Sequence, residues 1–202
     1  MAILLIKHNN SPNYEGKKIR QKVGLYVSFN KEKLRAAVFI DHSNIASPLL
    51  EPNCRKHERI DYKKLKDVLF QGYKEGVAIM FMGVMDPMRP EKEKFMKYLE
   101  KIDFVLMRVP LMKRKDGTFE QKQLDILMHE MMVSYAEANE FDVAILVSGD
   151  ADFVVAAQII KNMNKDVLVW SWKKSISLQL LETVGEGNVF YIDDIWNLVR
   201  KK

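Results

Sequence analysis

The chain has 202 residues, of which 48% are hydrophobic and 29% charged, and its formal net charge is +5. This balance is ordinary for a globular protein, and the length suffices for one well-buried domain. A single cysteine, Cys54, excludes an intrachain disulfide and a cysteine-based zinc site. The apolar segments are too short for a signal peptide or a membrane span, so we expect a cytoplasmic protein without membrane contact.

Residues 1–35 differ in pattern from the rest of the chain. Short apolar runs at 3–6 and 23–29 are typical of strands, and the polar stretch 8–16 between them is typical of a loop. We therefore predict a short N-terminal β appendage over residues 1–35 and a second unit over residues 36–202. An exposed edge of the appendage could pair with a second chain and make the protein a homo-oligomer.

From residue 36 onward, apolar runs that suit strands alternate with amphipathic segments that suit helices. In chain order, we predict a strand at 36–40, a helix at 60–73, a strand at 77–82, a helix at 90–101, a strand at 104–109, a helix at 122–139, a strand at 143–147, a helix at 153–163, a strand at 167–170, a helix at 178–184, a short strand at 189–191 and a helix at 193–199. We expect Asp193 to cap the last helix. This alternation predicts βαβ units and a mainly parallel sheet, which is an α/β fold.

Two carboxylates follow the fourth predicted strand. The five apolar residues 143–147 indicate a strand buried on both faces, and they lead through Ser148 and Gly149 to Asp150 and Asp152. Ligands of open α/β sheets bind at the carboxyl ends of the strands, so these acids are placed where chemistry is usually done. The competing interpretation is that one of the two acids only caps the helix that follows.

Other polar side chains are expected at the same edge of the sheet. Asp41 and Asn44 follow the first predicted strand, whereas Lys122 and Asp125 lie one turn apart at the start of the long helix. Each acid alone has a simpler explanation, because Asp41 could stabilise a turn and Asp125 could complement the helix dipole. If the strands are parallel neighbours, however, these acids converge with Asp150, and converging carboxylates bind a hard cation such as Mg²⁺ or Mn²⁺.

Three motifs occur in order along the chain, namely Asp41-His-Ser-Asn44, Lys122-Gln-Leu-Asp125 and Ser148-Gly-Asp-Ala-Asp-Phe153. Together they resemble the motifs of NYN domains of the LabA-like group, which belongs to the PIN-like nuclease superfamily. The resemblance covers roughly residues 36–172, and residues 1–35 lie outside it.

This resemblance implies a three-layer α/β/α sandwich around a mainly parallel central sheet. It also implies metal-dependent hydrolysis of phosphodiester bonds, with RNA as the expected substrate and Mg²⁺ or Mn²⁺ as the cofactor. By motif, the metal ligands would be Asp41, Asp125 and Asp150, with Asp152 in the same metal site. Asn44 would orient substrate or water, and Lys122 and Ser148 would line the site.

Basic and aromatic side chains could hold a nucleic acid beside this site. A basic cluster follows the third predicted strand and comprises Arg108, Lys113, Arg114 and Lys115, although a solvated loop is the simpler explanation. The candidates for stacking on unpaired bases are His42, Phe81, Trp170 and Trp172. We expect Phe81 and Trp170 to belong to the core. His42 stands where a small residue is common in the resembling family, so it could crowd the site.

Three functions compete for these residues. The leading hypothesis is a metal-dependent nuclease that acts on nucleic acid, with single-stranded RNA as the expected partner. The alternative is a non-catalytic nucleic-acid-binding or regulatory module that retains the acidic pocket. A phosphatase or nucleotide hydrolase is a weaker third hypothesis, because the chain has no glycine-rich phosphate loop.

Overall fold

The computed structural model describes residues 34–49, 58–113, 119–120 and 122–201. The predicted N-terminal β appendage, apart from residues 34 and 35, lies outside the described residues. Its proposed role in oligomer formation therefore stays a prediction. Within the described ranges, no helix is both long and apolar enough to cross a membrane.

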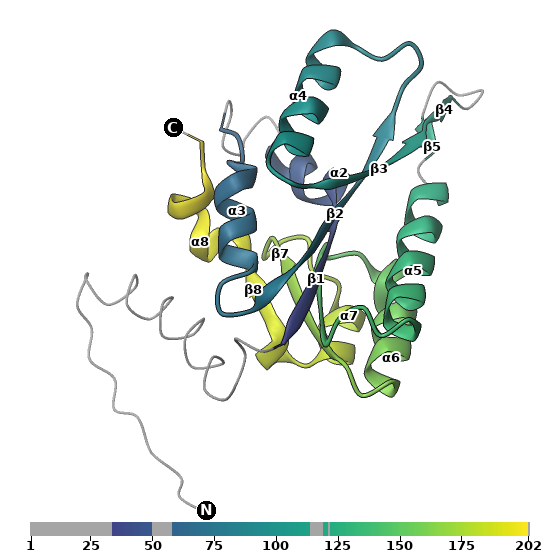
Figure 1. The fold of residues 1–202 in the computed structure, drawn as a ribbon, viewed down its shortest axis with the longest axis vertical. Helices are drawn as coiled ribbons and strands as arrows, with labels where there is room; N and C mark the ends of the chain where they lie inside the picture. Colours follow the sequence, from purple (N-terminus) through teal and green to yellow (C-terminus); the bar gives the residue numbers. More distant parts are fainter. Residues whose placement is uncertain (1–33, 50–57, 114–118, 121, 202) are drawn as a thin grey trace, which may run out of the picture.

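A sheet of six parallel strands forms the centre of the molecule, which confirms the predicted parallel α/β architecture (Figure 1). Its spatial order is β3-β2-β1-β6-β7-β8. The strands are β1 (Arg35–Asp41), β2 (Lys74–Val84), β3 (Val105–Pro110), β6 (Val143–Val147), β7 (Asp166–Ser171) and β8 (Val189–Tyr191). In chain order, β2 and β3 add to one side of β1, and β6, β7 and β8 then add to its other side. The order therefore reverses between β1 and β6, and such a reversal opens a crevice at the carboxyl ends of the two strands.

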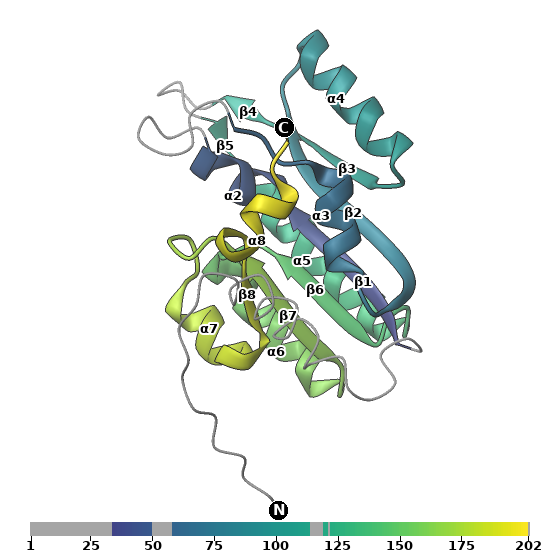
Figure 2. The same cartoon turned by 90° about the vertical axis from the view of Figure 1, so that its left-hand side faces the viewer.

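Helices cover both faces of the sheet, so the architecture is the predicted three-layer sandwich (Figures 1 and 2). One layer contains α2 (His42–Ala46), α3 (Tyr62–Leu69), α4 (Pro90–Lys101) and α8 (Ile192–Val199). The other layer contains α5 (Lys122–Glu137), α6 (Val154–Asn162) and α7 (Leu178–Val184).

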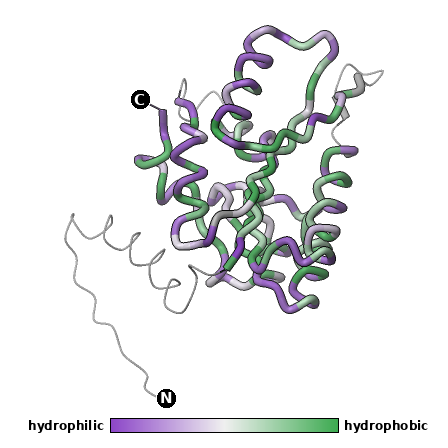
Figure 3. The backbone as a smooth tube through the Cα atoms, in the orientation of Figure 1, coloured by the Kyte–Doolittle hydropathy of each residue, from purple (hydrophilic) through white to green (hydrophobic). Residues whose placement is uncertain are grey.

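The central strand β1 shows why the sheet is covered on both sides. Ala36, Val38 and Ile40 pack into the core on the α3 side, whereas Ala37 and Phe39 pack into the core on the α5 side. All five are buried, so each alternate side chain finds an apolar layer. The hydrophobic residues accordingly follow the strands, whereas the helices carry both kinds of residue and α3 and α4 are mostly hydrophilic (Figure 3).

Several element boundaries differ from the prediction. Helix α3 begins only at Tyr62, because the Asp61 side chain accepts a hydrogen bond from the Lys64 backbone and caps it. Helix α8 begins at Ile192, and Asp193 does not cap it as predicted. Instead, the Asp193 carboxylate accepts a hydrogen bond of 2.9 Å from the Lys173 backbone.

Short elements were not predicted. They are α2, the 3₁₀ helices η2 (Ser47–Leu49), η3 (Ala151–Phe153) and η4 (Glu186–Asn188), and the hairpin strands β4 (Met112–Lys113) and β5 (Phe119–Glu120). Each has five residues or fewer, which is too short for a readable hydrophobic period.

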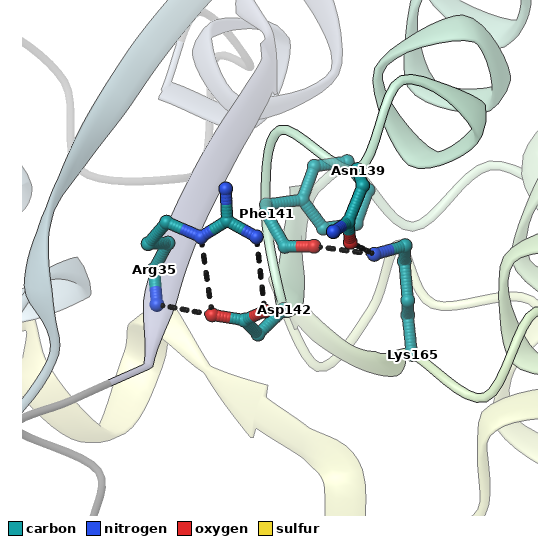
Figure 4. Close-up of polar contacts among 5 residues, drawn as sticks. All are labelled: Arg35, Asn139, Phe141, Asp142 and Lys165. Carbon is teal, nitrogen blue, oxygen red and sulfur yellow. Dashed lines mark hydrogen bonds and ion pairs between the residues drawn. The ribbon is translucent and has the colours of Figure 1, made fainter.

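Charged groups are paired at the amino-terminal edge of the sheet (Figure 4). The Arg35 backbone N–H donates to Asp142 Oδ2 at 2.8 Å, and its guanidinium donates to Asp142 Oδ1 at 3.2 Å. These bonds hold the pKa of Asp142 below its usual range. Beside them, Lys165 Nζ donates to Asn139 Oδ1 at 2.6 Å and to the Phe141 carbonyl at 2.7 Å. The starts of β1 and β6 are therefore joined by ion pairing as well as by backbone bonds.

Candidate functional site

A cavity of about 320 Å³ lies at the carboxyl edge of the sheet, where the strand order reverses. We call it the acidic cleft. Its lining residues are Asp41, Ser43, Asn44, Ser47, Pro48, Asp125, Asp150 and Ser175. Four of the residues predicted for the site are thus brought together, namely Asp41, Asn44, Asp125 and Asp150.

Asp41 is the last residue of β1 and also the N-cap of α2. Its Oδ1 accepts hydrogen bonds from the Ser43 and Asn44 backbone N–H groups at 3.0 and 3.1 Å, and from the Ser43 hydroxyl at 2.7 Å. Burial nevertheless raises the pKa of Asp41, against the effect of these bonds. One oxygen, Oδ1, is therefore fixed by the start of α2, whereas Oδ2 takes no part in this cap.

Asn44 serves first to position the turn after β6. Its Oδ1 accepts a hydrogen bond of 3.0 Å from the Gly149 backbone N–H. A side chain at Gly149 would not fit, because its Cβ would lie 2.2 Å from the Ser175 carbonyl oxygen. The amide oxygen of Asn44 is thus engaged with the protein, and its predicted role of orienting substrate or water stays a prediction.

Ser148 connects the acids beneath the cleft. This fully buried side chain donates a long hydrogen bond of 3.5 Å to Asp41 Oδ2, and its oxygen accepts from the Asp150 backbone N–H at 3.3 Å. Ser148 therefore contacts Asp41 and Asp150 from the protein interior and does not line the cavity itself.

Of the two acids that could cap the turn after β6, Asp150 is the one that caps η3. Asp150 Oδ1 accepts a hydrogen bond of 3.1 Å from the Asp152 backbone N–H. Because Asp150 also lines the acidic cleft, it serves both purposes. The exposed Asp152 faces a neighbouring cavity that shares Asp125 with the cleft.

The pKa of Asp125 shows the effect of the gathered negative charges in the cleft. Burial and the negative charges of Asp41, Asp150 and Asp152 together raise this pKa to about 6. Among the side chains that the structure describes, no lysine, arginine or histidine forms an ion pair with any of these four acids. The cleft therefore holds several carboxylates whose mutual repulsion the described residues do not relieve.

These carboxylates form an open arrangement. Within the described ranges, no three aspartate, glutamate, histidine or cysteine side chains are gathered closely enough to hold one ion. Mg²⁺ commonly keeps several waters and takes only one or two carboxylates from a protein. One or two carboxylates of the acidic cleft, completed by water, therefore suit such a hard, hydrated cation.

His42 points away from the acidic cleft, so it neither crowds the site nor offers a ring there. It stacks on Tyr62 at a centroid distance of 5.9 Å and contacts Phe95 at 5.5 Å. Burial and the charge of Lys92 lower its pKa to about 3. His42 therefore belongs to the packing between α2, α3 and α4.

The other expected nucleic-acid contacts change as well. Phe81 and Trp170 are core residues as expected, and Trp172 joins them, with its Nε1–H donating to the Ile45 carbonyl at 2.9 Å. Arg108 forms an ion pair with Glu100. The Lys122 side chain, the Lys113 side chain and residues 114–118 lie outside the description, so their roles stay predictions.

Four residues that line the cleft were not predicted from the sequence, namely Ser43, Ser47, Pro48 and Ser175. Ser175 follows β7, the next strand beyond β6, so the rule about carboxyl strand ends could have found it. Ser47 and Pro48 lie in η2, which gave no readable sequence signal.

Comparisons with known proteins agree with this architecture. The sequence model of the NYN domain matches residues 35–184. The crystal structure of a protein of unknown function from Vibrio parahaemolyticus is 24% identical, has a TM-score of 0.69, and covers 85% of this chain and 99% of that chain. That likeness shows the fold alone.

A PLP-bound putative aminotransferase from Clostridium difficile is 11% identical, with a TM-score of 0.32 over 71% of this chain and 40% of that chain. A TM-score of 0.32 does not indicate a shared fold. The search of curated proteins found no match.

Proposed function

Because the chain belongs to the NYN domain family, within the PIN-like nuclease superfamily, we propose that it is a metal-dependent nuclease that hydrolyses phosphodiester bonds in RNA. Membership suggests a nuclease-like function and an interaction with nucleic acid, and such nucleases generally use divalent metals. The observation that carries the proposal is the acidic cleft, where Asp125 has a pKa raised to about 6 beside three other carboxylates. Perturbed acids in a cleft are typical of functional sites.

In this proposal, Asp41, Asp125 and Asp150 hold Mg²⁺ or Mn²⁺, and Asp152 adds negative charge from the neighbouring cavity. When bound, such an ion lowers the pKa of coordinated water and offsets charge on the phosphate. The protein contributes rigid placement, because the start of α2 holds Asp41 and the η3 cap holds Asp150. Asn44 and Ser148 act as positioning residues that keep the two carboxylates in place.

RNA as the substrate, the LabA-like subgroup and a phosphate contact from Lys122 rest on the motif resemblance. The net charge of +5 supports a polyanionic substrate in general. The net charge does not distinguish RNA from DNA, so cleavage is measured on both.

A non-catalytic binding module is the second candidate. The open arrangement of the acids favours it, because the described residues hold no ready three-ligand metal site. Binding of labelled single-stranded RNA in Mn²⁺ without products over hours would support this candidate over the nuclease.

The central test replaces Asp150 by asparagine. Asp150→Asn keeps Oδ1 as the acceptor for the Asp152 N–H, so the turn should stay folded while one anionic ligand is lost. We expect Mn²⁺-dependent cleavage of single-stranded RNA to fall at least about 100-fold, since even outer residues of metal sites contribute about 10–100-fold. Cleavage by purified wild type and variant is measured from product ends on a gel.

Asp142→Asn is the matched control. It removes the same charge from an aspartate at the opposite edge of the sheet, where the carboxylate pairs with Arg35. Its cleavage rate should equal that of the wild type. Equal rates for wild type and Asp150→Asn would remove the proposed site.

A further inference from the structure

A second cavity, of about 340 Å³, adjoins the acidic cleft. Its lining residues are Asp125, Ile126, His129, Glu130 and Asp152, and we call it the α5 pocket. Asp125 lines both cavities, so it forms the wall between them. A molecule with a charged group in the acidic cleft therefore has the α5 pocket within reach of its next group.

The α5 pocket lies on the outer face of α5. Leu124, Met128 and Met132 turn inward and are buried in the core. Ile126, by contrast, is 58% exposed, although it belongs to a residue type usually found inside. The pocket thus offers one apolar side chain beside an imidazole and three carboxylates, so it combines an apolar contact with several hydrogen-bond acceptors.

Resting on the proposed nuclease function, we propose that the α5 pocket holds the unpaired nucleobase next to the phosphate bound in the acidic cleft. The volume lies near the lower end of the range of about 300–1,000 Å³ for ligand pockets, which suits a single nucleoside. Ile126 supplies apolar contact with the base plane, and the His129 ring supplies a second contact surface.

The carboxylate of Glu130 gives the pocket its preference among bases. A carboxylate only accepts hydrogen bonds, so it pairs with the exocyclic amino group of cytosine, adenine or guanine. Uracil has no exocyclic amino group, and its one donor on the pairing edge, N3–H, lies between two carbonyl oxygens, which a carboxylate repels. The α5 pocket therefore selects an amino-bearing base over uracil at the nucleotide beside the cleavage point.

The test replaces Glu130 by glutamine, which keeps the size of the side chain but adds a donor. Glu137→Gln, at the exposed end of the same helix, is the control with the same change of charge. Wild type and both variants cleave a mixed-sequence single-stranded RNA in Mn²⁺, and sequencing of the product ends gives the base beside each cut. We expect Glu130→Gln to lower the preference for amino-bearing bases over uracil about tenfold, with Glu137→Gln unchanged.

A binding measurement separates this inference from the nuclease proposal. If the wild type does not cleave RNA, fluorescence anisotropy compares labelled oligocytidine with labelled oligouridine on the same three proteins in Mn²⁺. Tighter binding of oligocytidine that is lost only in Glu130→Gln supports the α5 pocket while the nuclease proposal fails. Equal base preference for all three proteins, in cleavage or in binding, overturns the inference.

Discussion

At the amino-terminal edge of the sheet, Asp142 pairs with Arg35, whereas at the carboxyl edge Asp41, Asp125 and Asp150 face one another. The pKa of Asp142 lies below its usual range, but the pKa values of Asp41 and Asp125 are raised. The carboxylates at the two edges of the sheet are therefore in opposite electrostatic states.

The two edges contribute to the stability of the fold with opposite sign. A paired carboxylate favours the folded state, whereas gathered and partly buried carboxylates oppose it. A stable protein has no structural need for the second arrangement, so its presence is explained best by a ligand of opposite charge.

A bound divalent cation should offset the repulsion among the carboxylates of the acidic cleft. At a concentration of Mn²⁺ 100 times the dissociation constant, mass action adds about 2.7 kcal/mol to the free energy of unfolding. Thermal unfolding with and without Mn²⁺ should show this gain in the wild type and in Asp142→Asn, and a much smaller gain in Asp150→Asn. An equal gain in all three proteins would place the ion elsewhere.

The pH dependence of stability should have opposite signs at the two edges. The folded state raises the pKa of Asp125 to about 6, so its contribution is fully present below the unfolded pKa of about 4 and is lost as pH rises through about 6. The lowered pKa of Asp142 contributes stability above the unfolded pKa that is lost as pH falls.

Urea unfolding between about pH 3 and 8 separates these contributions. Asp125→Asn should remove the part of the decline that occurs toward pH 6, and Asp142→Asn should remove part of the loss in acid. If the stability of Asp125→Asn declines toward pH 6 as steeply as that of the wild type, the proposed charge repulsion in the cleft is wrong.

Asp142→Asn should have the smallest effect on stability at neutral pH. The Arg35 and Asp142 side chains are 37% and 35% exposed, so water screens the pair. We expect a loss of less than about 1 kcal/mol in the free energy of unfolding, measured with urea. A loss of several kcal/mol would mean that the amino-terminal edge is a main support of the fold.

Much of the fold could be predicted because its elements have strong local patterns. The bounds of β6 and α7 were predicted to the residue, since their apolar periods end abruptly at polar turns. The rule for parallel strands also brought Asp41, Asp125 and Asp150 to one edge.

Side-chain direction around the site could not be predicted in the same way. Which acid caps η3 depends on the exact turn after β6, and sequence spacing alone allowed either Asp150 or Asp152. The direction of His42 depends on α2 and on its contacts with Tyr62 and Phe95, which come from distant segments. The burial of Trp172 likewise depends on the Ile45 carbonyl across the fold.

The pairing of β1 with β6, which aligns Ile40 with Val147, joins segments that are far apart in the sequence. Asp41 and Asp150 therefore become neighbours only after the second half of the chain has docked on the first. A nascent or truncated polypeptide that ends before β6 carries two of the acids without the third. A cation whose ligands include Asp150 would thus bind only a chain that extends beyond β6, and it would stabilise the completed fold as well as aid the chemistry.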